Sequence, residues 1–255
     1  MAHTPTSPNT FPMTDESLNI AMGVYDRLSG VNKFGRNPTV DIGTEEEIWG
    51  GSVAYSFPAT ALITSMSQTA DQAALRGGTI EIQGLNSSWE LITQTKDLDA
   101  TLTTNVVTLG TPLIRVFRAK VLENVVSASP IRVHNAGETV DYAVIATGTN
   151  QTTMAIYTVP VGYEAYLTNY YAYVNPATNL DPTSMPVRLW ARDNALGIAK
   201  QLKHVVGLVS GGFQHTFDPY QKFTEKTDIY ITATPVGKAA DVSAGFDLVL
   251  HRKVS

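Results

Sequence analysis

Hydrophobic and polar residues alternate with the two-residue period of β-strands along most of the chain. In GGTIEIQGL (77–85), Ile80 and Ile82 are separated by polar residues, as in a half-buried strand. The segment LIRVFRAKV (113–121) repeats this pattern less regularly. From residue 127 onward, short apolar runs are separated by turn sequences rich in Gly, Asn, Asp and Pro. The pattern predicts an all-β protein.

The same pattern divides the chain into three regions. Residues 1–50 show no persistent strand or helix period and are broken by glycines, which indicates an extended N-terminal arm. Residues 51–126 are expected to form a smaller β-rich region, and residues 127–255 a C-terminal β-sandwich. Many short strands at regular spacing are typical of sandwiches and barrels. We therefore expect a jelly-roll-like β-sandwich preceded by an extended arm and a smaller β region.

The arm contains large apolar side chains that it cannot bury by itself. In one interpretation it lies on another surface, either of its own domain or of a neighbouring subunit. In the other, it is an irregular loop that wraps its own β core. Four of its residues are candidates for docking on a partner: Phe34, Arg36, Ile48 and Trp49. A tryptophan at such a place is typical of an interface anchor.

Composition narrows the classes of partner. Charged residues make up 16% of the chain, against roughly 25% in an ordinary soluble domain. A surface with few charges suits protein contacts, because little charge is desolvated when it is covered. The net charge of −5 and the lack of basic runs argue against nucleic acid. The long uncharged segment at residues 142–163 contains Gly, Pro and several Thr, so no membrane span is predicted there.

Candidate chemistry is sparse. The chain has no cysteine, which excludes disulfides and thiolate metal sites. It has no GxSxG, no Walker loop and no GxGxxG after a strand. None of the five histidines lies within four residues of another, although His204 and His215 could approach across strands as a zinc site. Isolated strand histidines are more often surface or core residues, so we predict no catalytic residue, no metal and no cofactor.

The segment NYYAYV (169–174) is rich in tyrosine. On a strand, Tyr171 and Tyr173 share one face and Tyr170 takes the other. Tyrosine rings make good platforms for sugars or protein partners. The alternative is a sandwich core with the phenol groups at its rim. These three tyrosines are the candidate glycan-binding residues.

Several segments of the chain resemble a family of tailed-phage virion proteins, many of them from aquatic phages. The resemblance rests on SLNIAMGVYDRLSGVNKFGRN (17–37), GGTIEIQGLNSSWELITQT (77–95), LIRVFRAKV (113–121), NAGE (135–138) and GTNQTTMAIYTVPVGYEAYLTNYYAYV (148–174). Asn86 stands where the family has Asp, and Val159 and Val161 stand where it has Ile and Ala. These motifs are structural, so the resemblance transfers no functional site.

The resemblance implies a virion structural protein on the capsid surface, made in the host cytoplasm. It implies a capsid decoration (cement) or minor capsid protein whose partners are the major capsid protein and neighbouring copies of itself. Decoration proteins commonly occupy threefold sites, which suggests a homotrimer. The alternatives are a head or tail fibre, an adaptor, or a carbohydrate-binding module that recognises a host surface glycan. An enzyme is the least expected class, and neither nucleic acid nor membrane is an expected partner.

Overall fold

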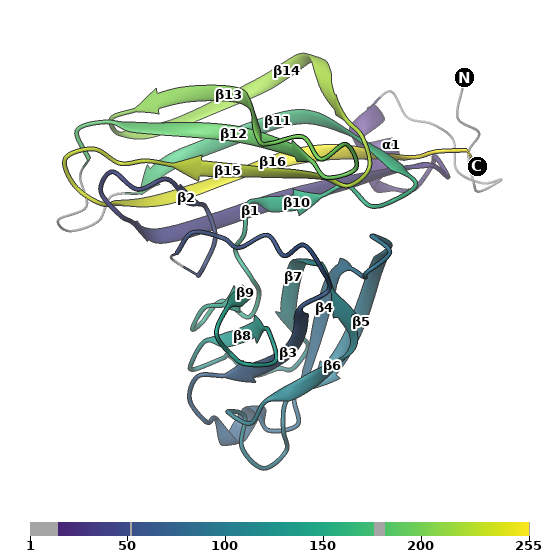
Figure 1. Ribbon diagram of the computed structural model, residues 1–255, viewed down its shortest axis with the longest axis vertical. Helices are drawn as coiled ribbons and strands as arrows, with labels where there is room; N and C mark the ends of the chain where they lie inside the picture. The colour runs from purple at the N-terminus through teal and green to yellow at the C-terminus, as the bar shows by residue number, and fades with distance from the viewer. Residues whose placement is uncertain (1–14, 52, 176–181, 255) are drawn as a thin grey trace.

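The computed structural model describes residues 15–51, 53–175 and 182–254. Figure 1 shows two β bodies, a large sandwich at the top and a small domain below it. Apart from helix α1 (Glu16–Ala21) and a 3-10 turn (Ala73–Leu75), the regular structure consists of antiparallel strands, which confirms the all-β prediction. Among the described residues, no helix is long and apolar enough to cross a membrane.

The large sandwich consists of two facing sheets. The first has the strand order β1–β16–β11–β14, and the second has the order β10–β15–β12–β13, with β2 added on β15. The strands are β1 (Leu28–Val40), β2 (Glu46–Glu47), β10 (Ile156–Thr158), β11 (Tyr163–Asn175), β12 (Met185–Asp193), β13 (Gln201–Leu208), β14 (Gly211–Phe223), β15 (Thr227–Ala233) and β16 (Ala240–Arg252).

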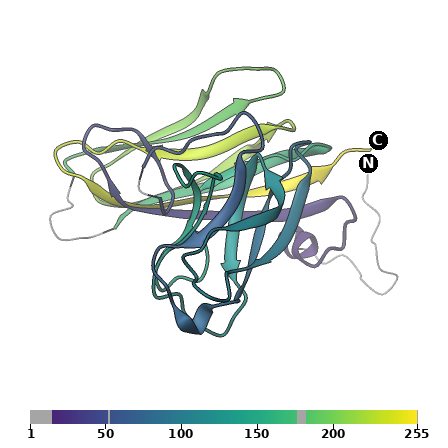
Figure 2. The same ribbon diagram turned by 60° about the horizontal axis from the view of Figure 1, so that its bottom comes forward.

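The main strands of the large sandwich pair from the outside of the sequence inward. The first strand β1 pairs with the last strand β16, β10 pairs with β15, β11 with β14, and β12 with β13. The pairs β11–β16 and β12–β15 then join these ribbons into two sheets. In Figures 1 and 2, purple β1 and yellow β16 lie side by side, although they come from opposite ends of the chain.

The small domain, residues 63–145, is inserted between β2 and β10. It has one sheet of order β6–β3–β8–β9 and another of order β5–β4–β7. Its strands are β3 (Ile63–Gln68), β4 (Thr79–Leu85), β5 (Leu91–Asp97), β6 (Val107–Leu113), β7 (Arg115–Val121), β8 (Ile131–His134) and β9 (Asp141–Ile145). Ile80 and Ile82, the alternating residues of the sequence, are both fully buried in it.

The two bodies share side chains across their junction. Leu85 and Phe117 of the small domain pack into the core of the large sandwich. In return, Tyr230 of β15 packs into the core of the small domain. The junction is therefore a packed apolar contact, and burial of this kind holds two bodies in a fixed orientation.

The prediction that residues 1–50 form an extended arm is wrong for the part of this segment that the structure describes. Residues 28–40 form β1, a full member of the first sheet, and residues 1–14 lie outside the described residues. The glycines that suggested an irregular arm include Gly35, where a Cβ would lie 2.3 Å from the carbonyl oxygen of Ile48. Gly35 therefore permits close packing between two backbone segments rather than ending a strand.

The predicted boundary near residue 127 is also wrong. Strands β8 and β9 follow that residue, yet β8 pairs with β3 and β9 pairs with β8 inside the small domain. The small domain therefore continues to residue 145. The C-terminal sandwich is not a separate C-terminal unit, because its first strand comes from residues 28–40.

Candidate functional site

The outer face of the first sheet carries three rows of residues. Each row runs across the four strands β1, β16, β11 and β14. The rows are Asn32–Asp247–Asn169–Thr216, Phe34–Gly245–Tyr171–Gln214 and Arg36–Ser243–Tyr173–Gly212. Residues opposite each other in antiparallel register point to the same face of a sheet. The neighbouring positions Phe246 and Tyr170 are fully buried, so these rows point away from the core. We call this surface the aromatic face.

Two glycines form the floor beneath the tyrosine rings. A Cβ on Gly212 would lie 1.9 Å from Cδ1 of Tyr173, so the ring occupies the space above that glycine. A Cβ on Gly245 would lie 2.5 Å from the hydroxyl oxygen of Tyr171. The two ring centroids are 6.0 Å apart with planes tilted by 52°. The rings thus lie down along the sheet, and Tyr173 keeps 43% of its surface exposed.

A fixed polar network borders the rings. Arg36 donates from Nε to Oδ1 of Asp241 over 3.0 Å and from Nη2 to Oδ2 over 2.5 Å. Asn175 Nδ2 donates to Oδ1 of the same carboxylate over 2.8 Å and to the hydroxyl of Ser243 over 2.7 Å. The hydrogen bond to Asp241 raises the pKa of Arg36. The guanidinium is therefore charged and held in place, while its side chain remains 56% exposed.

A groove of about 680 Å³ continues the aromatic face toward α1. Polar and aromatic side chains line part of it, including Glu16, Ser17, Asn32, Tyr166, Tyr220 and Asp247, and aliphatic side chains line the rest, namely Ile20, Leu28, Val31, Leu248 and Val249. Asn32 Nδ2 donates to Oδ1 of Asp247 over 2.5 Å, and Asn169 Nδ2 donates to Oδ2 over 3.1 Å. The remaining amide oxygen of Asn169 is buried without a hydrogen-bond partner. The floor therefore presents oriented amide and carboxylate groups beside an open volume.

The structure brings together residues that the sequence placed in two separate candidate sets. Phe34 and Arg36, the expected docking residues, share rows with Tyr171 and Tyr173, the expected glycan platform. Tyr170 lies on the opposite side of the strand, as the alternation predicts, and is fully buried. It cannot contact a ligand at the surface, so it is removed from the glycan-binding set.

Ile48 and Trp49 are not docking anchors, because they are 0% and 1% exposed. The Ile48 amide donates to the carbonyl of Ile231 in β15 over 3.0 Å, which ties this segment to the second sheet. Trp49 Nε1 donates to the carbonyl of Val53 over 2.7 Å, and its ring packs edge-on against Tyr55. The sequence around these residues shows no strand period, so their burial could not be inferred from it.

His204 and His215 do approach each other across strands, but as stacked rings. Their centroids lie 4.6 Å apart at an angle of 24°, and His204 Nδ1 lies 2.5 Å from the hydroxyl of Tyr170. Burial lowers the pKa of His204, and the neighbouring His215 lowers it further. No group of three or more His, Cys, Asp or Glu residues suited to a metal ion occurs in the part of the chain that the structure describes.

Sequence reasoning missed a serine–histidine pair in the small domain. Ser67 Oγ lies 3.0 Å from Nε2 of His134, and His134 Nδ1 lies 2.8 Å from the carbonyl oxygen of Asn135. Ser67 Oγ also lies within hydrogen-bond distance of Glu138. The two residues are 67 positions apart, so no local sequence motif contains both of them. Ser67 and His134 are 1% and 0% exposed, which prevents this serine from reaching a substrate.

A buried ion cluster joins the two bodies. Arg115 of β7 donates from Nε to Oδ1 of Asp228 over 2.8 Å and from Nη2 to Oδ2 over 3.0 Å. Arg192 donates to the same carboxylate over 2.7 Å, and Thr158 donates to it over 2.6 Å. Burial opposes ionisation of Asp228, but its bonds and charge interaction with Arg115 hold the pKa of this carboxyl below its usual value. The cluster is thus a structural link between the bodies.

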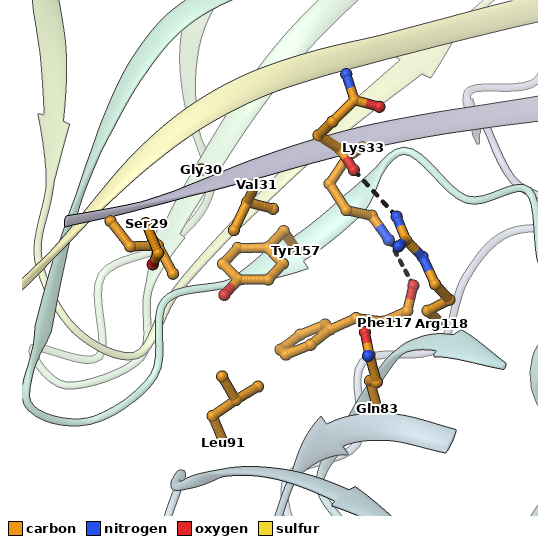
Figure 3. Close-up of a pocket in the computed structure, with 11 residues that line it drawn as sticks. Ser29, Gly30, Val31, Lys33, Gln83, Leu91, Phe117, Arg118 and Tyr157 are labelled. Carbon is orange, nitrogen blue, oxygen red and sulfur yellow. Dashed lines mark hydrogen bonds between the residues drawn. The ribbon is translucent and has the colours of Figure 1, made fainter. Parts of the chain in front are cut away.

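A second polar link uses a buried lysine (Figure 3). Lys33 of β1 is 4% exposed, and its amine donates to the carbonyl of Phe117 in β7. Arg118 Nη2 donates in the opposite direction, to the carbonyl of Asn32, over 3.2 Å. Burial, with a smaller contribution from the charge of Arg118, lowers the pKa of Lys33 to about 7. Burying the charged form of a lysine that has no carboxylate partner lowers the stability of the folded state.

Comparisons with known proteins give no assignment. No protein-family model matches the chain, and no curated protein matches it. Among solved structures, T=1 particles derived from infectious bursal virus align over 90% of this chain and 74% of theirs, with 11% identity and a TM-score of 0.21. The VP2 subviral particle of infectious bursal disease virus aligns over 99% and 80%, with 8% identity and a TM-score of 0.18. TM-scores this low do not establish a shared fold.

Proposed function

We propose that this chain is a structural protein of a tailed-phage virion, and specifically a decoration protein that binds and stabilises the outer capsid shell. The observation that carries the proposal is the inward-nested strand pairing of the large sandwich. Eight antiparallel strands paired in this way support a jelly-roll architecture for the large sandwich. Jelly rolls are the architecture of many viral capsid and lectin domains. The resemblance of the sequence to tailed-phage virion proteins favours a capsid domain over a lectin domain.

The attachment surface that we propose is the outer face of the second sheet at its β13 edge. Leu202 and Val205 are 47% and 49% exposed, and their partners in register are Trp190 and Arg188. Within the described residues, β13 pairs with β12 alone, so its other edge offers free backbone groups. Full burial of an exposed Leu or Val contributes about 1.5–3 kcal/mol. Contacts of this kind fit the major capsid protein and neighbouring copies in a homotrimer.

The proposed mechanism is stabilisation by binding. A protein that binds the expanded shell, and not the subunits in other arrangements, favours that shell by mass action. Many copies on one particle convert a modest contact into large avidity. No catalytic step is part of this proposal. The Ser67–His134 pair is buried and has no part in the proposed binding.

Binding to capsids tests the proposal directly. The full chain is incubated with phage capsids that lack it, the particles are sedimented, and bound protein is located by electron cryomicroscopy. We expect regular lattice positions, and a mass about three times 27.6 kDa for the free protein in light scattering. Leu202→Asp combined with Val205→Asp should abolish binding, whereas Tyr173→Ala should not. Density at a single vertex or on the tail would support a fibre or adaptor instead, and lack of any binding would refute the proposal.

A further inference from the structure

We propose that the aromatic face binds a neutral saccharide, and that this activity is separate from attachment to a shell. The proposal rests on the geometry of the first sheet and does not depend on the virion role. Its two elements are ring faces that lie along the sheet and polar groups that are already held in place beside them.

The tyrosine rings are oriented as stacking platforms. Tyr173 lies over Gly212, so the sheet covers one side of the ring, and the 43% exposure of the residue leaves the other side open. Tyr171 leans the other way, over Gly245, where Phe34 is the partner in register on β1. The apolar face of a pyranose ring packs on surfaces of this kind, because aromatic rings offer a broad contact at low cost in conformational entropy.

The polar groups around the rings match the vicinal hydroxyls of a sugar. The exposed guanidinium of Arg36 is held by Asp241, whose carboxylate also accepts from Asn175. On the other side of the Phe34–Tyr171 row, Asp247 accepts from Asn32 and Asn169. Each of these side chains is fixed by the others before a ligand arrives. Binding therefore orders few additional side chains, which lowers its entropic cost.

The face fits a saccharide better than a protein partner. Its three rows contain aromatic, glycine, amide, hydroxyl and charged residues, and no Leu, Ile, Val or Met, whereas aliphatic side chains line part of the adjoining groove. Protein interfaces rely on projecting side chains that enter pockets of the partner. The exposed aliphatic residues Leu202 and Val205 lie on the second sheet instead. The outer faces of a sandwich point in opposite directions, so attachment through the second sheet leaves the aromatic face open to solvent.

The local charge selects the class of sugar. Among the residues of the three rows, the neighbouring Asp241 and the lining of the groove, the charged groups are the carboxylates of Asp241, Asp247 and Glu16 and the guanidinium of Arg36. A negative surface disfavours sugars that carry carboxylate or sulfate groups. The groove of about 680 Å³ beside the first row, which contains Asn32 and Asp247, extends the site, so that an oligosaccharide gains contacts that a single sugar lacks.

A glycan array that holds neutral and acidic oligosaccharides tests the proposal on the full chain. The best neutral oligosaccharide is then titrated by calorimetry against wild type and three variants. Tyr173→Ala removes one platform, and we expect affinity to fall about tenfold. Gly212→Ala keeps both tyrosines but places a methyl group where the Tyr173 ring lies, so a loss of similar size is expected. Leu202→Ala, on the opposite outer face, should leave affinity unchanged.

The outcomes separate the alternatives. Saturable binding of neutral sugars that Tyr173→Ala and Gly212→Ala both weaken supports the proposal. It is overturned if no oligosaccharide on the array binds saturably, or if the two variants bind as tightly as Leu202→Ala. It is also overturned if Tyr173→Ala loses capsid binding while the wild type binds no sugar, because the face would then be a protein interface. Circular dichroism of each variant confirms that the fold is retained.

Discussion

Replacement of Lys33 by Met should change how the stability of the protein depends on pH. The lysine is 4% exposed, it lies at the junction of the two bodies, and its amine has a backbone carbonyl as its hydrogen-bond acceptor (Figure 3). Burial and the nearby charge of Arg118 lower its pKa from 10.5 to about 7. Methionine fills a similar volume and carries no proton.

The size of the effect follows from the two pKa values. Between pH 7 and 10.5 the folded protein releases a proton from Lys33 that the unfolded chain retains. The free energy of unfolding therefore rises with pH through this window, and below about pH 7 the fold bears the full cost of a buried charge. For these pKa values, linkage gives a rise of about 2 kcal/mol from about pH 7 to about pH 9.

Urea unfolding followed by tryptophan fluorescence measures this rise. Wild type should gain about 2 kcal/mol between pH 7 and pH 9 from Lys33, and Lys33→Met should lose that gain. The matched control is Lys200→Met, a lysine whose side chain is 46% exposed, which should retain the wild-type dependence. If wild type and Lys33→Met give parallel curves across this range, the amine does not titrate as a buried group and the reasoning is wrong.

Three other predictions address the buried cluster, the first strand and the stacked histidines. Asp228→Asn leaves buried arginine unpaired, so urea unfolding should show a loss of about 3–5 kcal/mol, whereas Asp71→Asn in a surface ion pair should change little; equal losses would contradict the assignment. Deletion of residues 1–50 removes β1, so circular dichroism should show loss of the folded state, and a folded product would contradict the role of β1. Since the pKa of His204 is lowered in the fold, the unfolded chain binds more protons as pH falls through about 6.5. His204→Gln should therefore lose less thermal stability than wild type between pH 7 and 5, and parallel melting curves would refute this.

Local alternation in the sequence identified individual strands and the faces of their residues. Ile80 and Ile82 were expected on one side of a strand, and both are fully buried in β4. Tyr171 and Tyr173 were expected opposite Tyr170, and Tyr170 is the buried one. Such predictions succeed because the two-residue period of a strand is a local property of the chain.

The pairing of distant strands was not visible in the sequence. β1 contains glycine, which obscured its strand period, and its partner β16 lies at the other end of the chain. No local signal links Phe34 to Gly245 or to Tyr171, so the aromatic face could only be recognised from the register. For the same reason, the insertion of residues 63–145 appeared as a separate β region followed by a boundary at 127.

The nested arrangement of the large sandwich also determines when it can fold. Asn32 of β1 and Asp247 of β16 are hydrogen-bonded neighbours separated by 215 positions. The named strands of the small domain pair with one another within residues 63–145, and β7 adds a short bridge from Lys120 to Gln151, so this domain can assemble while the chain is still being synthesised. The large sandwich cannot form until β16 has been synthesised. Pairing β1 with β16 closes the long loop of chain between them, which makes this step slow. During this interval β1 lacks its partner β16, so its backbone groups are open to association with other nascent copies.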